Sequence, residues 1–287
     1  MSEFQVPIRP AVRNLPRYRP GKAAPGAVKL SSNEMATPPS APILEAMRKA
    51  LENVNRYPDL MATPVREAIA KRFKVFPEQV CVGTGSSALL LAALSAVCSP
   101  GAKVVYPWRS FESYPIAIPA SHAEGVPVPL DEDGGHDVEG LVCAAQDVTA
   151  LILCSPNNPT GPVLTFDTIR DIVERVPASV LVLVDEAYID FASDPRVSSA
   201  IPLIEEHPNV LVLRTFSKVH ALAGVRVGYA IGNTELIGAI QAVSVPFGVS
   251  SVAQAAALAS LEDEAGVRAS AQAVIAERER MIAALRE

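Results

Sequence analysis

Short, almost wholly apolar runs alternate along this chain with longer segments in which apolar residues recur every three or four positions. The first pattern is typical of buried strands and the second of helices with one buried face. Strands are predicted at residues 79–83, 102–107, 149–154, 179–188, 209–218 and 225–232. Helices are predicted at residues 41–54, 63–73, 86–98, 166–176 and 233–243, and from residue 252 almost to the last residue. This order predicts an α/β fold with a mainly parallel sheet between two layers of helices.

Composition narrows the classes of function. The 287 residues are 49% hydrophobic and 20% charged, enough to bury a sizeable core. The net charge of −6 includes no basic run, which argues against nucleic acid or an anionic membrane surface as the main partner. No stretch has the length of a membrane span or the apolar core of a signal peptide, so a cytoplasmic location is expected. The four cysteines show no CxxC spacing and are expected to be reduced thiols.

Polar clusters follow four of the predicted strands at their carboxyl ends. They read GTGSS (residues 83–87), SPNNPTG (155–161), DEAY (185–188) and TFSK (215–218). In open α/β sheets, ligands bind in the crevice outside these ends. The sequence therefore predicts a small-molecule site where the four clusters meet.

The GTGSS cluster has three readings. Ser86 and Ser87 could simply cap a helix, or the helix N-terminus could bind a phosphate. Extended to Ala88, the stretch also matches the G-x-G-x-x-G/A dinucleotide fingerprint of an NAD-dependent dehydrogenase. That reading needs an acidic residue at the end of the next strand, and Glu112 lies too far beyond it.

The other clusters also have structural alternatives. SPNNPTG could be only a turn, because Asn-Pro and Thr-Gly favour turns. Asp185 and Glu186 end an aliphatic strand, where carboxylates must be paired structurally or belong to a site. Lys218 could be a solvated loop lysine, but the neighbouring clusters favour a functional amine.

Taken together, TFSK followed by Arg226, DEAY, NNPTG and the early RYPD resemble the fold type I aminotransferases that use pyridoxal 5'-phosphate. Within that family, the chain resembles the class II branch containing histidinol-phosphate and aromatic amino acid aminotransferases, from about residue 12 to the last residue. The resemblance implies a seven-stranded type of sheet in a large cofactor-binding domain. It divides the chain into an N-terminal arm (1–29), the large domain (30–262) and the first helix of an incomplete small α/β domain (263–287).

The same resemblance implies roles for individual residues. Lys218 would form the internal aldimine, Asp185 would face the pyridine nitrogen, and Tyr188 and Asn158 would hydrogen-bond the phenolic oxygen. Phe111 would stack on the ring, with Trp108 or Tyr114 as alternatives. The phosphate would be held by the following group, the last member coming from a second subunit of a homodimer: Gly85, Ser86, Ser87, Thr215, Ser217, Arg226 and Tyr57.

The chemistry explains these residue types. An amine attacks an aldehyde only when it is neutral, so Lys218 needs a lowered pKa, which burial beside cationic groups provides. A carboxylate such as Asp185 keeps the pyridine nitrogen protonated, so that the ring can accept electrons when the substrate loses its α-proton. Arg226 and a helix N-terminus suit a dianionic phosphate.

Substrate and activity are the least determined features. Within the branch, the chain more closely resembles the aromatic amino acid members, which implies transamination between an aromatic L-amino acid and 2-oxoglutarate. Pro246-Phe247 replaces the Pro-Tyr that is commoner in histidinol-phosphate aminotransferases, which remain the alternative. The arm reads Asn-Glu-Met-Ala at residues 33–36 in place of Asn-Glu-Asn-Pro. The late arginine that clamps the substrate carboxylate in the family has no match among Arg268, Arg278, Arg280 and Arg286. We therefore expect a truncated chain that binds cofactor but transaminates little, and a cofactor-binding protein without turnover stays open.

Overall fold

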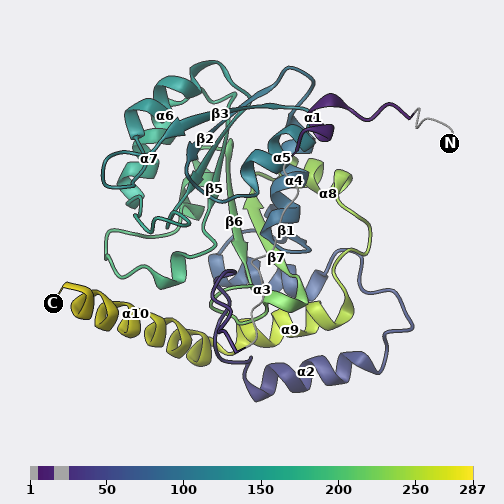
Figure 1. Ribbon diagram of the computed structural model, residues 1–287. Helices are drawn as coiled ribbons and strands as arrows, with labels where there is room; N and C mark the ends of the chain where they lie inside the picture. The colour runs from purple at the N-terminus through teal and green to yellow at the C-terminus, as the bar shows by residue number, and fades with distance from the viewer. Residues whose placement is uncertain (1–5, 16–25, 287) are drawn as a thin grey trace, which may run out of the picture.

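A seven-stranded mixed sheet forms the centre of the computed structural model, which describes residues 6–15 and 26–286 (Figure 1). The strands are β1 (Val80–Gly83), β2 (Lys103–Trp108), β3 (Glu124–Pro129), β4 (Ala150–Cys154), β5 (Leu181–Asp185), β6 (Val210–Thr215) and β7 (Gly228–Gly232). Their order is β1-β7-β6-β5-β4-β2-β3. Strands β2 to β6 pair in parallel, whereas β7 is antiparallel to both β6 and β1, so β1 runs in the same direction as the parallel strands. The predicted α/β fold with a mainly parallel sheet is confirmed.

Ten α-helices surround or extend from this sheet. They are α1 (Pro10–Arg13), α2 (Ala41–Leu51), α3 (Thr63–Phe73), α4 (Ser86–Val97), α5 (Tyr114–Ala120), α6 (Val138–Ala144), α7 (Phe166–Arg175), α8 (Thr234–Val243), α9 (Ser251–Glu262) and α10 (Glu264–Arg286). Short 3-10 turns occupy Pro77–Gln79, Ala145–Asp147, Ile189–Phe191, Ile201–Glu205 and Ala223–Val225. These counts cover the described residues.

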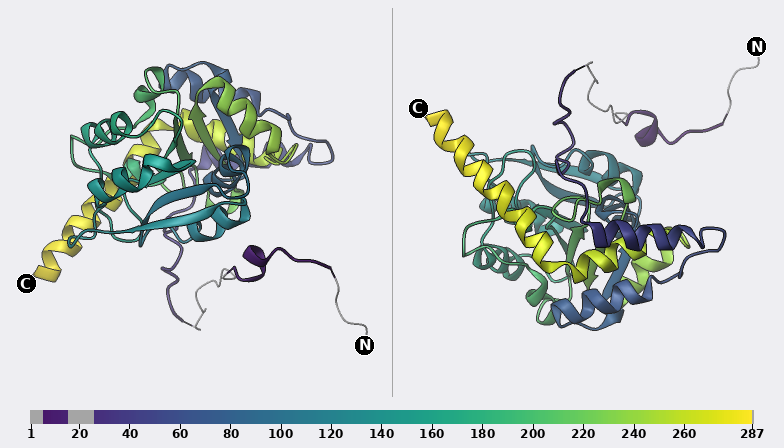
Figure 2. Two further views of the ribbon diagram at one scale, coloured as in Figure 1. Left: turned by 90° about the horizontal axis from the view of Figure 1, so that it is seen from above. Right: turned by 90° about the horizontal axis from the view of Figure 1, so that it is seen from below.

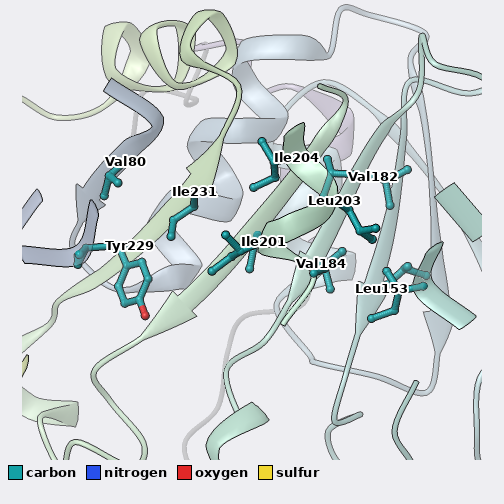
Figure 3. Close-up of a cluster of buried hydrophobic side chains, with 14 of the residues drawn as sticks. Val80, Leu153, Val182, Val184, Ile201, Leu203, Ile204, Tyr229 and Ile231 are labelled. Atoms are coloured by element: carbon teal, nitrogen blue, oxygen red, sulfur yellow. The ribbon is translucent and has the colours of Figure 1, made fainter. Parts of the chain in front are cut away.

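The two faces of the sheet carry separate cores because side chains alternate along each strand. In β5, Val182 and Val184 join the core under α3, α6, α7 and α9, while Leu181 and Leu183 join the core under α4, α5 and α8. Figure 3 shows the first core, where Val182 and Val184 lie beside Leu153 and Ile201. Burial on both faces explains why the central strands are continuous aliphatic runs.

The C-terminal helical region differs from the prediction. It is two helices, α9 and α10, separated at Asp263. The Asp263 carboxylate accepts hydrogen bonds from Gly266 N at 3.1 Å and from Ser40 Oγ at 2.7 Å, so it caps α10 and ties it to the start of α2. Helices α2 and α9 pack together, and α10 extends away from the sheet (Figures 1 and 2).

The sequence prediction also missed four helices and strands, α1, α5, α6 and β3. It extended two strands too far, because the predicted strands ending at residues 188 and 218 stop at Asp185 and Thr215. Of the predicted N-terminal arm, residues 1–5 and 16–25 lie outside the described residues. The described part includes α1, and Arg9 donates to Ala120 O at 3.0 Å.

Candidate active site

The four polar clusters meet at one edge of the sheet. Strands β1, β4, β5 and β6 all end there, and the loops after them line a cavity of about 640 Å³. Ser86, Asn158, Asp185 and Lys218 each bring one cluster into its wall. The convergence inferred from strand ends is therefore present in the fold.

Asp185 forms the buried floor of this cavity. Its side chain accepts a hydrogen bond from Tyr114 Oη at 3.0 Å, and one from Ala187 N at 3.2 Å. Burial raises the pKa of Asp185, while the two hydrogen bonds and the positive charge of Lys218 act in the opposite direction. The carboxylate is thus held by neutral donors and faces a cation across the cavity.

Glu186 points to the opposite side of β5 and has a structural role. It accepts hydrogen bonds from Ala200 N at 2.7 Å and Ser199 Oγ at 2.8 Å, and lies 3.4 Å from Arg214 Nε. Burial raises the pKa of Glu186, and Arg214 opposes that rise. Of the two acidic residues of DEAY, one faces the cavity and the other forms a buried ion pair.

Lys218 lies in the loop after β6, with its amine at the cavity wall. Its Nζ donates to Ser32 O at 3.0 Å and to Asn33 O at 3.3 Å. Burial lowers the pKa of Lys218 and Arg226 adds to the effect, against the opposing charges of Glu34 and Asp185. This is the direction that a nucleophilic amine requires.

One end of the cavity lies where α4 begins and has groups that suit an anion. Ser86 and Ser87 are its first helical residues and line the cavity, with free backbone N–H groups expected at a helix N-terminus. Arg226 donates to Ser217 Oγ at 3.4 Å, and a Cβ on Gly85 would come within 2.8 Å of Arg226 Nη2. Gly85 has φ +87°, a conformation that favours glycine, and a larger residue would also displace the end of the Arg226 side chain.

Thr215, the last residue of β6, is buried at the same end of the cavity. It lines the cavity, and its Oγ1 accepts a hydrogen bond from Ser217 N at 3.0 Å. The hydroxyl therefore fixes the turn that carries the predicted phosphate-binding residues.

The predicted ring contacts are also at the cavity. Asn158, Tyr188 and Phe111 all line it, and Tyr188 Oη accepts a hydrogen bond from Asn33 Nδ2 at 3.0 Å. The preceding residue, Asn157, is buried and bonded to Ser110 Oγ at 2.6 Å, so the second asparagine is the one that faces the cavity.

Neither alternative for the stacking residue lines the cavity. Trp108 lies outside its wall, and Tyr114 is fully buried behind Asp185. Tyr57 also lies away from the cavity of its own chain, with 83% of its surface exposed, in the loop between α2 and α3. Its predicted contact with a second subunit stays a prediction.

Sequence reasoning missed part of the cavity wall. Residues 30–34 of the N-terminal segment, together with Arg109 and Glu112, line it. Residues 33–36 had drawn notice only because they read Asn-Glu-Met-Ala in place of the family's Asn-Glu-Asn-Pro. Nothing in the sequence pattern placed these residues near Lys218. None of the four late arginines, residues 268, 278, 280 and 286, lines the cavity.

Comparison with known proteins identifies the family. The model for aminotransferase class I and II matches residues 25–287. The chain belongs to the class I and II aminotransferases.

Curated relatives of this aminotransferase include the aromatic amino acid aminotransferases of Corynebacterium efficiens and Rhodococcus erythropolis. The first is 48% identical over 96% of this chain and 81% of the relative, and the second is 45% identical over 98% and 78%. Among solved structures, a putative histidinol-phosphate aminotransferase from Erwinia carotovora atroseptica matches with a TM-score of 0.84 and 30% identity, covering 89% of this chain and 75% of that chain. The histidinol-phosphate aminotransferase of Sinorhizobium meliloti, in complex with pyridoxal-5'-phosphate, gives 0.83 and 27%, covering 87% and 68%.

The cavity of the aminotransferase fits pyridoxal phosphate, the cofactor supported by the family and by the Sinorhizobium complex. One cavity contains an amine, a buried carboxylate and a helix N-terminus with an arginine beside it, groups that would suit the aldehyde, the ring nitrogen and the phosphate of this cofactor. Family membership also overturns the dinucleotide-binding interpretation of GTGSSA. In the described residues, no helix is both long and apolar enough to cross a bilayer.

Proposed function

We propose that this aminotransferase moves the amino group between an aromatic L-amino acid and 2-oxoglutarate. The observation that most supports this proposal is the position of Lys218, which lines one cavity together with Asp185 and Arg226. Relatives that are 43–48% identical and named aromatic amino acid aminotransferases support the substrate class. The structural neighbours named histidinol-phosphate aminotransferases are only 26–30% identical, which favours that alternative less.

Bound pyridoxal phosphate supplies an aldehyde that condenses with amines and a ring that accepts electrons. In our assignment, the Asp185 carboxylate would lie against the ring nitrogen and hold its proton. Asn158 and Tyr188 would hydrogen-bond the phenolic oxygen, and Phe111 would cover one face of the ring. These contacts would orient the ring relative to the Lys218 amine.

The phosphate would be bound at the N-terminus of α4. Ser86 and Ser87 would donate from the helix end, and Arg226 would supply the cation. Thr215 at the end of β6 and Ser217 in the loop after it would also donate.

Lys218 would carry the proton transfer. Its lowered pKa gives a larger neutral fraction near pH 8 than an ordinary lysine has, so Nζ can act as a base toward the substrate Cα proton. The same amine, once protonated, can return that proton as an acid. One residue can therefore serve both directions of the reaction.

A substrate comparison tests the proposal. Rates with 2-oxoglutarate should be higher for phenylalanine and tyrosine than for histidinol phosphate, and Lys218→Ala should abolish them. A preference for histidinol phosphate would reverse the substrate assignment. A protein that binds pyridoxal phosphate but turns over none of these amines would instead match the alternative without turnover.

We also propose that the chain is a homodimer. Tyr57 and Phe247 lie together with ring centroids 4.8 Å apart, and their exposed fractions are 83% and 40%. Leu60 and Val245 are also exposed and line a second cavity of about 430 Å³, whose wall includes Pro246 and Gly248 on either side of Phe247. This exposed apolar surface is costly to leave in water and suits a second copy that receives Tyr57 at its phosphate.

Sedimentation across a dilution series tests the homodimer. Loss of cofactor should accompany dissociation, and Tyr57→Phe should weaken cofactor binding without changing the monomer fold. A folded, cofactor-saturated monomer would refute the homodimer.

The four cysteines are free thiols, in keeping with the proposed cytoplasmic location.

A further inference from the structure

Tyr114 connects Asp185 and Phe111, two of the residues predicted to contact the cofactor ring. It is the first residue of α5 and fully buried, and its hydroxyl donates to Asp185 Oδ2 at 3.0 Å. Its ring meets the Phe111 ring edge-on, with centroids 5.6 Å apart and an angle of 89° between the planes. Its backbone N–H also donates to Phe111 O at 3.0 Å.

We propose that Tyr114 is a positioning residue for the cofactor ring: its hydroxyl fixes the Asp185 carboxylate and its ring supports Phe111. The inference rests on the proposed function, because it requires a ring nitrogen opposite Asp185. A phenylalanine would fill the same apolar space without a hydroxyl to desolvate. The hydrogen bond to the Asp185 carboxylate is therefore what offsets the cost of burying the Tyr114 hydroxyl.

The neutrality of Tyr114 suits this role. An arginine or lysine at the same place would satisfy Asp185 but cancel its negative charge. A phenol donates a hydrogen bond and leaves the charge for a cationic partner in the cavity.

The other titratable groups around Asp185 also leave its negative charge uncancelled, except for Lys218. Burial raises the pKa values of Tyr114, Cys154 and Tyr188, so these neighbours are neutral near pH 8. Lys218 is the cationic neighbour whose charge lowers the pKa of Asp185. When Lys218 becomes neutral, the hydrogen bonds from Tyr114 and Ala187 remain to hold the carboxylate ionised.

Three variants separate the hydroxyl from the ring. Tyr114→Phe removes only the hydroxyl, and Tyr114→Leu also removes the contact with Phe111. Tyr106→Phe is the matched control, because its ring lies 6.4 Å from that of Tyr114 and its hydroxyl makes no hydrogen bond to a described residue. Thermal unfolding and circular dichroism establish that each variant is folded.

The first readout is the titration of Asp185 in cofactor-free protein. Carboxyl ¹³C signals of aspartate-labelled protein report it, and Asp185→Asn assigns the signal. Tyr114→Phe should move the titration to higher pH, because a donor that stabilises the ionised form is lost. Replacement of Tyr114 by 3-fluorotyrosine, a more acidic phenol of similar size, should move it to lower pH, and Tyr106→Phe should leave it unchanged.

The second readout is the dissociation constant for pyridoxal phosphate. It should rise roughly tenfold in Tyr114→Phe, the counterpart of losing one hydrogen bond to a charged group, and further in Tyr114→Leu. An Asp185 titration that is the same in wild type, Tyr114→Phe and the fluorotyrosine form overturns the inference. Failure of the wild type to bind the cofactor overturns the proposed function, and the titration still decides whether Tyr114 controls Asp185.

Discussion

Gly228→Ala should weaken cofactor binding although Gly228 is not itself a predicted cofactor-binding residue. Gly228 pairs with both Gly83 and Thr215 in the antiparallel part of the sheet. A Cβ there would lie 2.6 Å from Ser86 N and 2.9 Å from Gly85 C. Those atoms form the start of α4, where the phosphate is proposed to bind.

The size of the effect follows from these distances. Ordinary contact with a Cβ begins at 3.4 Å, so Ser86 N must move by about 0.8 Å, the difference from 2.6 Å. Overpacking of this kind typically costs about 1–3 kcal/mol of stability. Misplacing a donor to a charged phosphate forfeits about 1.5–3 kcal/mol, which raises the dissociation constant for pyridoxal phosphate roughly tenfold to a hundredfold.

Equilibrium titration of cofactor-free protein with pyridoxal phosphate, together with thermal unfolding, measures both effects. Gly238→Ala is the matched control, because nothing lies within 4 Å of its Cβ position in α8. That variant should bind normally and be equally or slightly more stable, by up to about 1 kcal/mol. Wild-type affinity and stability in Gly228→Ala would show that the start of α4 does not depend on this close contact.

Lys218→Ala should bind pyridoxal phosphate only non-covalently, so that borohydride treatment followed by denaturation leaves no cofactor mass on the protein; cofactor still attached to this folded variant after that treatment would exclude Lys218 as the covalent residue. Arg214→Met should lower stability by about 3–5 kcal/mol, because it leaves Glu186 buried without its cation, and adding Glu186→Gln should recover part of the loss in chemical denaturation. A simple sum of the two single losses would contradict this pairing. Burial lowers the pKa of His220 to about 4, so its contribution to stability should be present above about pH 6.5 and be lost as the pH falls toward 4. His220→Gln, which can keep a hydrogen bond to Ser260 Oγ, should lose less thermal stability than the wild type as the pH falls. The same dependence of stability on pH in both proteins would show that His220 is not the cause of the loss.

The elements that could be predicted from sequence are those whose apolar pattern follows from burial alone. Strands β4, β5 and β6 are aliphatic on both faces, and their polar ends identify the edge that carries the site. Strand β3 was missed because prolines break its alternation, which an edge strand tolerates. Helix α5 was missed for a similar reason, since Pro115 and Pro119 lie within seven residues.

The site itself was only partly predictable. Lys218, Asp185 and Arg226 stand at strand ends or in a recognisable spacing, and all three line the cavity. Whether Asp185 or Glu186 faced the site could not be decided from composition, because both are acidic and adjacent; the pleat of β5 decides it. The role of Tyr114 depends on a contact across 71 positions of sequence, which no local pattern encodes.

The N-terminal segment beside Lys218 has a kinetic consequence. Ser32 O and Asn33 O both accept hydrogen bonds from the Lys218 amine, while Asn33 Nδ2 donates to Tyr188. The cofactor can reach that amine only after these two carbonyls release it. The observed rate constant for uptake of pyridoxal phosphate, measured by stopped-flow absorbance, should therefore reach a plateau at high cofactor concentration. The plateau equals the rate at which residues 32–33 withdraw. A rate constant that keeps rising linearly with concentration would mean that no such gate operates.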